Sequence, residues 1–170
     1  DRQGRTWERQ ARVKARCIAG DMQLGEGLLA NLRPWVYSRW LPRTEISGIR
    51  ALKRQIERRS IREGFDSADL KTGRGGIRDI EFTIQFLQLL SGGDEAAVRV
   101  GNTIEAIRRL AANGSLNDQE REILERNYRL LRTVEHRLQI LYDRQTHRLP
   151  ENEDEFTRLA GRLGYGRQVN

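Results

Sequence analysis

The sequence predicts an all-α fold: a single helical-bundle domain of about six to seven helices, with a central buried helix after a Gly-rich loop. Three observations support this fold class. Apolar residues recur at three- and four-residue spacings along most of the chain, and strand-like alternation is almost absent. Of the 170 residues, 37% are hydrophobic and 32% are charged, as in long helices with charged outer faces around one core.

The first third of the chain predicts three helices. They cover residues 7–18, 22–33 and 45–62. In the first helix Lys14 falls in an apolar lane, so its ammonium group either reaches the edge of the core or points at a buried anion. Asp21 is positioned to cap the second helix.

Aromatic residues follow the second predicted helix. Pro34 can interrupt or restart that helix, and the segment 35–41 after it contains two of the three tryptophans. Aromatic side chains at helical spacing predict core packing, whereas aromatics among arginines could instead stack nucleic-acid bases.

The most informative stretch is a glycine-rich loop over residues 69–76, which runs into an apolar helix over residues 77–90. Three glycines in four positions permit close approach of the backbone to a ligand, and a helix start supplies unpaired N–H groups. With Lys71 and Arg74 as cations, the loop outlines an anion site. Alternatively it is a tight connection whose cations are only solvated.

The helix over residues 77–90 carries one polar lane on an otherwise apolar surface. The lane consists of Arg78, Glu81, Gln85 and Gln88. Unpaired buried polar groups cost about 1–3 kcal/mol each, so we expect each member of the lane to have a partner.

Three more helices are predicted, over residues 102–113, 118–143 and 153–163. In the longest one Glu135 falls inside the apolar sector and needs a cation. We expect the polar lanes of the two long helices to face each other, with Arg78 or Arg132 reaching Glu135. His136 and His147 are expected to be solvent-facing or structural rather than ligands.

The composition excludes several classes of site. Cys17 is the only cysteine and there are two histidines, so no intrachain disulfide and no Cys/His metal site is predicted. No apolar run approaches the roughly 20 residues of a membrane span, and the N-terminus has no targeting signal, so we expect a cytoplasmic protein. Because the chain starts at Asp1 and stops just after an apparent helix, we expect a fragment of a larger protein.

The net charge of +7 is uneven along the chain. Residues 1–62 contain 15 Lys and Arg against 6 Asp and Glu, whereas residues 63–170 contain 16 against 18. Nonspecific nucleic-acid binding by the arginine-rich helices is therefore one alternative, although basic residues on exposed helix faces are usually solvated. A second alternative is a protein-interaction module whose basic part docks a regulatory partner or a neighbouring domain.

Three spaced motifs resemble one known family, the glutamine synthetase adenylyltransferase/adenylyl-removing enzymes. The match covers nearly the whole chain in order. It comprises TWERQA, VKAR and AGD at residues 6–11, 13–16 and 19–21, then LKTGRGGIRDIEF at 70–82 with Gln85, and finally Leu131-Arg132, Glu135, Leu138-Gln139, Asp143, Gln145-Thr146 and Leu149-Pro150.

This resemblance implies a large two-headed enzyme in which each head pairs a nucleotidyltransferase core with a helical domain. One head adenylylates glutamine synthetase and the other removes AMP by phosphorolysis, with Mg²⁺ and ATP or ADP bound in the parent enzyme and a PII-type signalling protein as regulator. The form of the loop and the aromatic stretch near Pro34 resemble the N-terminal, adenylyl-removing head. The core is expected upstream of residue 1, so residues 1–170 would be one helical domain.

The resemblance also assigns expected roles to individual residues. The catalytic Asp-x-Asp pair is absent from the chain, which should therefore frame the reaction without performing it. The expected nucleotide- or phosphate-binding residues are Lys14, Arg16, Lys71, Arg74, Gly75 and Gly76. The expected site-shaping residues are Arg78, Glu81, Arg132 and Glu135.

Overall fold

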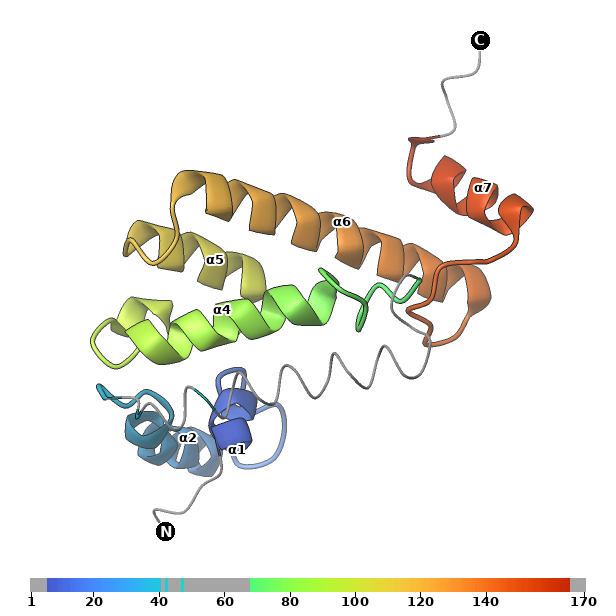
Figure 1. Cartoon of the computed structure of the whole chain (residues 1–170). Helices are drawn as coiled ribbons and strands as arrows, with labels where there is room; N and C mark the ends of the chain where they lie inside the picture. The colour runs from blue at the N-terminus through green and yellow to red at the C-terminus, as the bar shows by residue number, and fades with distance from the viewer. Residues whose placement is uncertain (1–5, 41, 43–46, 48–67, 166–170) are drawn as a thin grey trace. The chain divides into compact units, whose positions relative to one another are not determined.

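The computed structural model describes residues 6–40, 42, 47 and 68–165, and the predicted helical fold is confirmed for them. No β-strand occurs among these residues, where one isolated antiparallel bridge joins Asp69 and Arg148. The predicted helix over residues 45–62 lies, except for position 47, outside the described residues. The helices labelled in Figure 1 are α1 (Thr6–Arg12), α2 (Met22–Val36), α4 (Ile77–Ser91), α5 (Thr103–Ala112), α6 (Asp118–Tyr142) and α7 (Glu153–Arg162), and a short 3-10 helix, η1, spans Ala96–Val98.

The chain divides into two compact units. Unit 1 comprises Asp1–Gln55 and Glu81–Glu125, and unit 2 comprises Ile56–Ile80 and Arg126–Asn170. Each unit is described by itself below. The expectation that residues 1–170 act as one domain behind an upstream catalytic core stays a prediction.

Short polar side chains start four of the helices. Asp21 caps α2 as predicted, because its carboxylate accepts the N–H of Leu24 at 3.0 Å. Asn102, Asn117 and Asn152 accept N–H groups in the first turns of α5, α6 and α7 in the same way. These caps satisfy donors that a helix start leaves without an intrahelical acceptor.

The first helix is shorter than predicted, since α1 ends at Arg12 instead of continuing to residue 18. The N–H groups of Val13 and Ala15 bond to carbonyls three residues earlier, so the chain turns out of the helix here. The turn buries Val13 and ends the apolar lane, and Ile18, predicted on that lane, is 81% exposed.

Pro34 does not interrupt α2, which continues to Val36. Proline removes a backbone N–H and crowds the preceding turn, and the helix ends two residues after it. The N–H of Tyr37 then closes the last turn on the carbonyl of Arg33 at 2.8 Å.

The core of unit 1 gathers around α4. Its buried cluster contains Val13, Val36, Tyr37 and Leu89, with Trp35 and Phe86 packed against it. The predicted core role is therefore confirmed for Trp35, whereas Trp40 is 86% exposed.

The polar side chain of Gln88 is buried inside unit 1, and its amide nitrogen makes two hydrogen bonds. Its Nε2 donates to the carbonyls of Val98 and Val100 at 2.7 and 2.8 Å. This pair of bonds holds the chain just after η1 against α4 and satisfies an amide that would otherwise be costly to bury.

The core of unit 2 joins α6 and α7. Its buried cluster contains Val134, Leu138 and Leu159, and the partly buried hydrophobic residues packed against it are Leu70, Tyr142, Leu149 and Leu163. Because Leu70 begins the glycine loop, this core anchors one end of the loop.

Candidate functional site

The glycine loop, residues 69–76, is tied at its start to the chain that follows α6. The N–H of Leu70 donates to the carbonyl of His147, and the N–H of Leu149 donates to the carbonyl of Ala68, both at 2.8 Å. The loop therefore starts from a fixed backbone ladder.

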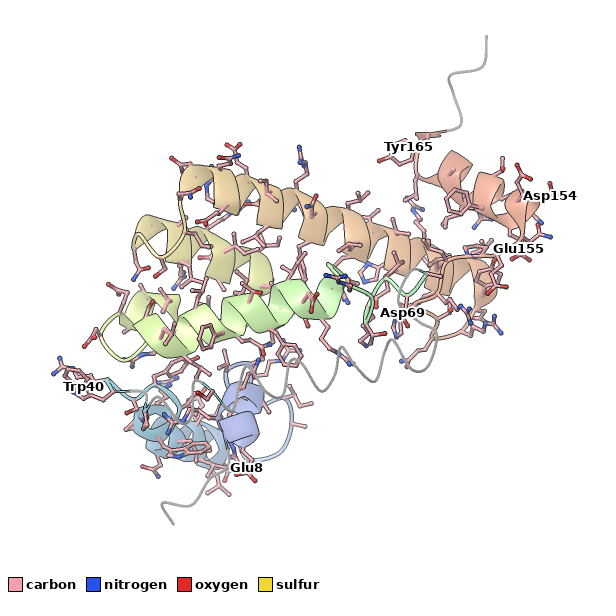
Figure 2. The ribbon with its side chains drawn as sticks, in the orientation of Figure 1. Glu8, Trp40, Asp69, Asp154, Glu155 and Tyr165 are labelled. Atoms are coloured by element: carbon pink, nitrogen blue, oxygen red, sulfur yellow. The ribbon has the colours of Figure 1, made fainter. Side chains whose placement is uncertain are left out.

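Two carboxylates hold the loop from inside. Oδ1 of Asp69, labelled in Figure 2, accepts the N–H groups of Lys71 and Thr72 at 2.8 and 2.7 Å. Asp79, in the first turn of α4, accepts the N–H of Gly75 at 2.9 Å through Oδ2. An aspartate that bonds its own following backbone forms a compact turn, and this loop uses that device at its start.

Two of the glycines are required by the geometry. Gly75 has φ of +73°, in the left-handed region that side chains disfavour. A Cβ on Gly76 would lie 2.7 Å from the carbonyl oxygen of Leu70 and 2.8 Å from that of Gly73. These glycines therefore make the tight turn possible, independently of any ligand.

The backbone donors of this region are already used. The N–H groups of residues 71–73 and 75–80 each bond to an oxygen between residues 69 and 79. The expectation that unpaired N–H groups face an anion is therefore wrong at these positions. The loop can offer a ligand its side chains, but few of its amides.

The cations of the loop region are available for such a role. Lys71 is half-buried and Arg74 is exposed, and Arg78 is half-buried at the start of α4. No hydrogen bond or ion pair connects these three side chains to any other residue in the described part of the chain. Three cations therefore lie along eight residues without a side-chain hydrogen bond or ion pair to the described residues, while the carboxylates of Asp69 and Asp79 beside them bond to backbone N–H groups.

Glu135 is the buried charge of unit 2, as the sequence predicts, with 2% of its side chain exposed. Its two carboxylate oxygens contact different side chains: Oε2 accepts from Arg132 Nη1 at 2.5 Å, and Oε1 lies 2.6 Å from Nδ1 of His147. The histidine contact has an ion-pair distance without the angle of a hydrogen bond. Arg132, rather than Arg78, is thus the arginine that reaches Glu135.

His147 connects the buried carboxylate to the glycine loop. Its side chain contacts Glu135, while its carbonyl accepts the N–H of Leu70. The structural role expected for His147 is confirmed. Arg132 and Glu135 therefore act on the loop through the backbone of residue 147.

Lys14 has a defined place in unit 1. Its Nζ lies 2.9 Å from Oε1 of Glu81 and 2.9 Å from Oγ1 of Thr103, and about a third of its side chain is exposed. Beside it, Gln10 donates to Gln85 at 3.3 Å. The polar lane of α4 is therefore met here by residues 10–14, and the prediction that the polar lanes of α4 and α6 face each other stays a prediction.

The predicted site residues fall into two groups. Lys14 and Glu81 contact each other in unit 1, where Arg16 is exposed on the loop after α1. The residues that belong to unit 2 are Lys71, Arg74, Gly75, Gly76, Arg78, Arg132 and Glu135. A cleft shared by the two groups stays a prediction.

Four residues of these clusters were not among the predicted site residues. They are Asp69, Asp79, Thr103 and His147. Asp69 could be found from sequence, because an aspartate at the start of a turn commonly bonds the backbone N–H two residues on. Thr103 and His147 depend on contacts between distant segments and leave no local signal.

The acidic residues do not form a metal centre in the described part of the chain. No group of three or more His, Cys, Asp or Glu side chains there could hold a metal ion. Asp69 and Asp79 are instead directed at backbone N–H groups, so the donor set does not fit Mg²⁺. Among the same residues, no helix is long and apolar enough to cross a membrane.

Comparison with known proteins identifies the family. Residues 50–170 match the family described as GlnD PII-uridylyltransferase. The chain is 46% identical over 164 residues to the bifunctional glutamine synthetase adenylyltransferase/adenylyl-removing enzyme of Xanthomonas campestris pv. campestris (strain B100), and 96% of the chain is covered. The enzymes of the same name from Stenotrophomonas maltophilia (strain R551-3) and Brucella suis biovar 1 (strain 1330) are 44% and 41% identical over 96% and 95% of the chain.

The chain corresponds to only part of these relatives. It spans 17% of the Xanthomonas and Brucella enzymes and 18% of the Stenotrophomonas enzyme. The chain belongs to the GlnD PII-uridylyltransferase family, and its resemblance to the glutamine synthetase adenylyltransferase/adenylyl-removing enzymes, predicted from its motifs, is confirmed.

Proposed function

We propose that this chain is the helical, substrate- and nucleotide-framing domain of a cytoplasmic enzyme that adenylylates and deadenylylates glutamine synthetase and so regulates nitrogen assimilation. We assign it to the N-terminal, adenylyl-removing head. Its partners would be glutamine synthetase, a PII-type signalling protein and an upstream nucleotidyltransferase core. The catalytic carboxylates, with their Mg²⁺, would belong to that core.

The observation that carries this proposal is the pair of cations on the glycine loop. Lys71 and Arg74 have no hydrogen-bond or ion-pair partner among the described residues. The loop beneath them is fixed by Asp69, Asp79 and the ladder to His147. A rigid backbone with uncommitted cations suits a phosphate group, whose charge needs positioned donors.

The chemistry assigned to the loop is positioning and charge neutralisation. Phosphoryl transfer depends mainly on these two effects. Lys71 and Arg74 would donate N–H bonds to phosphoryl oxygens, while Glu135 and Arg132 would keep the loop in place through residue 147. Lys14 would contribute its positive charge from its place beside Glu81 and Thr103.

Calorimetric titration with ADP at fixed ionic strength tests the role of the loop. Hydrogen bonds to charged groups contribute about 1.5–3 kcal/mol, so Lys71→Ala is expected to weaken ADP binding by about tenfold or more. Arg126→Ala is the matched control, because Arg126 is an exposed arginine on α6 with no side-chain hydrogen bond or ion pair to another described residue. Equal affinities of the wild type and Lys71→Ala, or no binding by the wild type, would contradict the proposal.

A second candidate function is a protein-interaction module, and α2 favours it. Leu24 and Leu28 are 73% and 58% exposed on that helix. They line a shallow hollow together with Asp21 and Gly27. A Leu24→Ser/Leu28→Ser variant that retains ADP binding but no longer associates with the remainder of the enzyme would support this role.

A further inference from the structure

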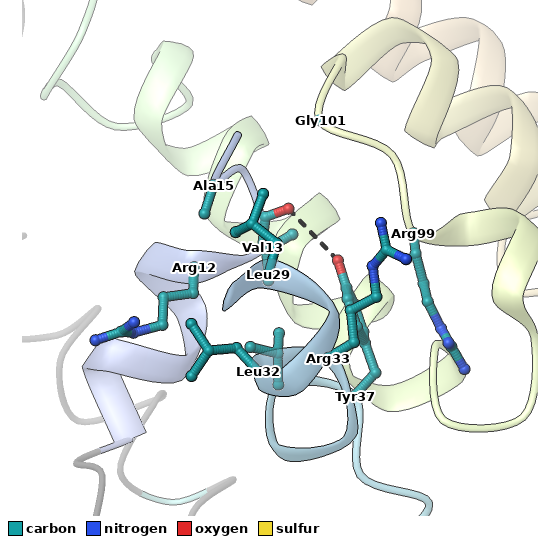
Figure 3. Close-up of a pocket in the computed structure, with 10 residues that line it drawn as sticks. Arg12, Val13, Ala15, Leu29, Leu32, Arg33, Tyr37, Arg99 and Gly101 are labelled. Carbon is teal, nitrogen blue, oxygen red and sulfur yellow. Dashed lines mark hydrogen bonds between the residues drawn. The ribbon is translucent and has the colours of Figure 1, made fainter. Parts of the chain in front are cut away.

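A small pocket in unit 1 is lined by apolar residues and three arginines. It has a volume of about 100 Å³ and lies among the turn after α1, helix α2 and the segment around residue 99. Figure 3 shows the residues that line it. Three are arginines, Arg12, Arg33 and Arg99, and none is acidic.

The three arginines differ in how their charge is used. The guanidinium of Arg12 lies 5.9 Å from the ring of Trp35. Arg99 donates to the carbonyls of Gly92 and Gly93 at 2.6 and 3.3 Å and lies 5.3 Å from the ring of Tyr37, so it is fixed in place. Arg33, on the exposed side of α2, has no side-chain hydrogen bond or ion pair with another described residue.

Tyr37 forms the polar part of the pocket floor. Its hydroxyl donates to the carbonyl of Val13 at 3.4 Å, a long contact that can be exchanged for a better acceptor. Burial raises the pKa of Tyr37, and the charges of Arg99 and Arg33 oppose this effect. The neutral phenol is therefore a donor at physiological pH.

We propose that this pocket binds a small tetrahedral oxyanion of the size of inorganic phosphate. Arg33 supplies charge and N–H donors, the Tyr37 hydroxyl supplies a neutral donor, and Arg99, whose Nε and Nη2 bond to the carbonyls of Gly92 and Gly93, adds positive charge. Arginine is the side chain whose paired N–H donors match oxyanions best. A cavity of about 150 Å³ accommodates one benzene molecule, so a pocket of about 100 Å³ has room for an inorganic anion.

This site is separate from the role proposed for the glycine loop. The ammonium group of Lys14 is committed to Glu81 and Thr103, although its neighbours Val13 and Ala15 line the pocket. The pocket therefore needs no residue of the proposed nucleotide site. An anion bound here joins three segments of unit 1 and stabilises that unit by mass action.

Phosphate titration of the whole chain at fixed ionic strength tests the proposal. Calorimetry measures the binding, and thermal unfolding measures the shift of the midpoint temperature. The wild type is expected to bind phosphate and sulfate and to unfold at a higher temperature in their presence. Acetate, which is planar and carries one charge, is expected to bind at least several-fold more weakly.

Two variants and one control locate the binding. Arg33→Gln is expected to weaken phosphate binding by about tenfold or more, because it removes a positive charge and the paired N–H donors of the guanidinium, and Tyr37→Phe by several-fold, because it removes one donor. Arg137→Gln, at an exposed α6 position, is expected to leave phosphate affinity unchanged. Wild-type affinity in Arg33→Gln, or equal weakening by Arg137→Gln, would overturn the proposal, since binding would then lie elsewhere or reflect overall charge alone.

Discussion

Replacing Glu135 by glutamine tests whether a buried charge holds the glycine loop in place. The carboxylate is 2% exposed and lies 2.5 Å from Arg132 and 2.6 Å from His147. Glutamine keeps the size and one acceptor oxygen but removes the negative charge. The Arg132 guanidinium and the His147 ring would then face a neutral amide.

The expected loss of stability follows from these contacts. Removing one partner of a buried ion pair costs about 3–5 kcal/mol when the other charge stays buried. Arg132 is 39% exposed and His147 is 26% exposed, so water can partly solvate both. We therefore expect Glu135→Gln to lower the free energy of unfolding by about 2–3 kcal/mol.

Urea denaturation at neutral pH measures this change. Glu151→Gln is the matched control, because Glu151 pairs with Arg148 at 2.7 Å with 77% of its side chain exposed. An exposed pair of this kind is worth about 0–1 kcal/mol. A loss in Glu135→Gln no larger than that of the control would refute the reasoning.

Hydrogen exchange separates the effect on the loop from general destabilisation. The N–H of Leu70 bonds to the carbonyl of His147, so weaker anchoring of residue 147 should expose it more often. In Glu135→Gln we expect this amide to exchange about tenfold faster, relative to amides in unit 1. Unchanged relative protection would show that the carboxylate does not position the loop.

Two further predictions concern a glycine and a tyrosine. Gly76→Ala should lower the free energy of unfolding, measured by urea denaturation, by about 1–3 kcal/mol, because the new Cβ would lie 2.7 and 2.8 Å from two backbone oxygens. Gly27→Ala is the control: Gly27 lies in a helix and a Cβ there would have no atom within 4 Å, so this change should be neutral or stabilising. Tyr142 donates to Glu155 at 2.6 Å, and this bond raises its pKa above the ordinary value of 10.0. The stabilising contribution of this hydrogen bond should be complete below pH 10 and be lost as the pH rises through the higher folded-state pKa. The urea midpoint should therefore decline at alkaline pH, and Tyr142→Phe should remove that part of the decline. A Tyr142→Phe profile that matches the wild type would contradict this assignment.

Helix starts were the part of the fold most accessible from sequence. The cap at Asp21 depends on a few adjacent residues, so its signal is local. The end of α1 is different, because the turn after Arg12 brings Lys14 to Glu81, 67 positions away in sequence. Ile18 fits the predicted helical lane well and is nevertheless exposed. Sequence periodicity could not predict this, because it carries no information about the long-range contact that ends the helix.

The candidate site was predictable where its signals are local in sequence and not where they depend on contacts between distant segments. Helical periodicity alone places Glu135 among apolar residues, and Arg132 lies one turn away on the same helix. His147 could not be assigned to Glu135, because the chain reverses after α6, where Asp143 adopts φ of 47°. A left-handed aspartate is uncommon, and its position cannot be read from spacing.

The closed hydrogen-bonding pattern of the glycine loop also affects how it can respond to a ligand. Residues 71–73 and 75–80 already have acceptors for their N–H groups, so their backbone need not become ordered when a ligand arrives. The conformational entropy lost on binding would then come mainly from Lys71 and Arg74, at most about 2 kcal/mol for each long side chain. Ligand exchange at such a loop can be fast, because only side-chain rotamers change while the main chain stays fixed.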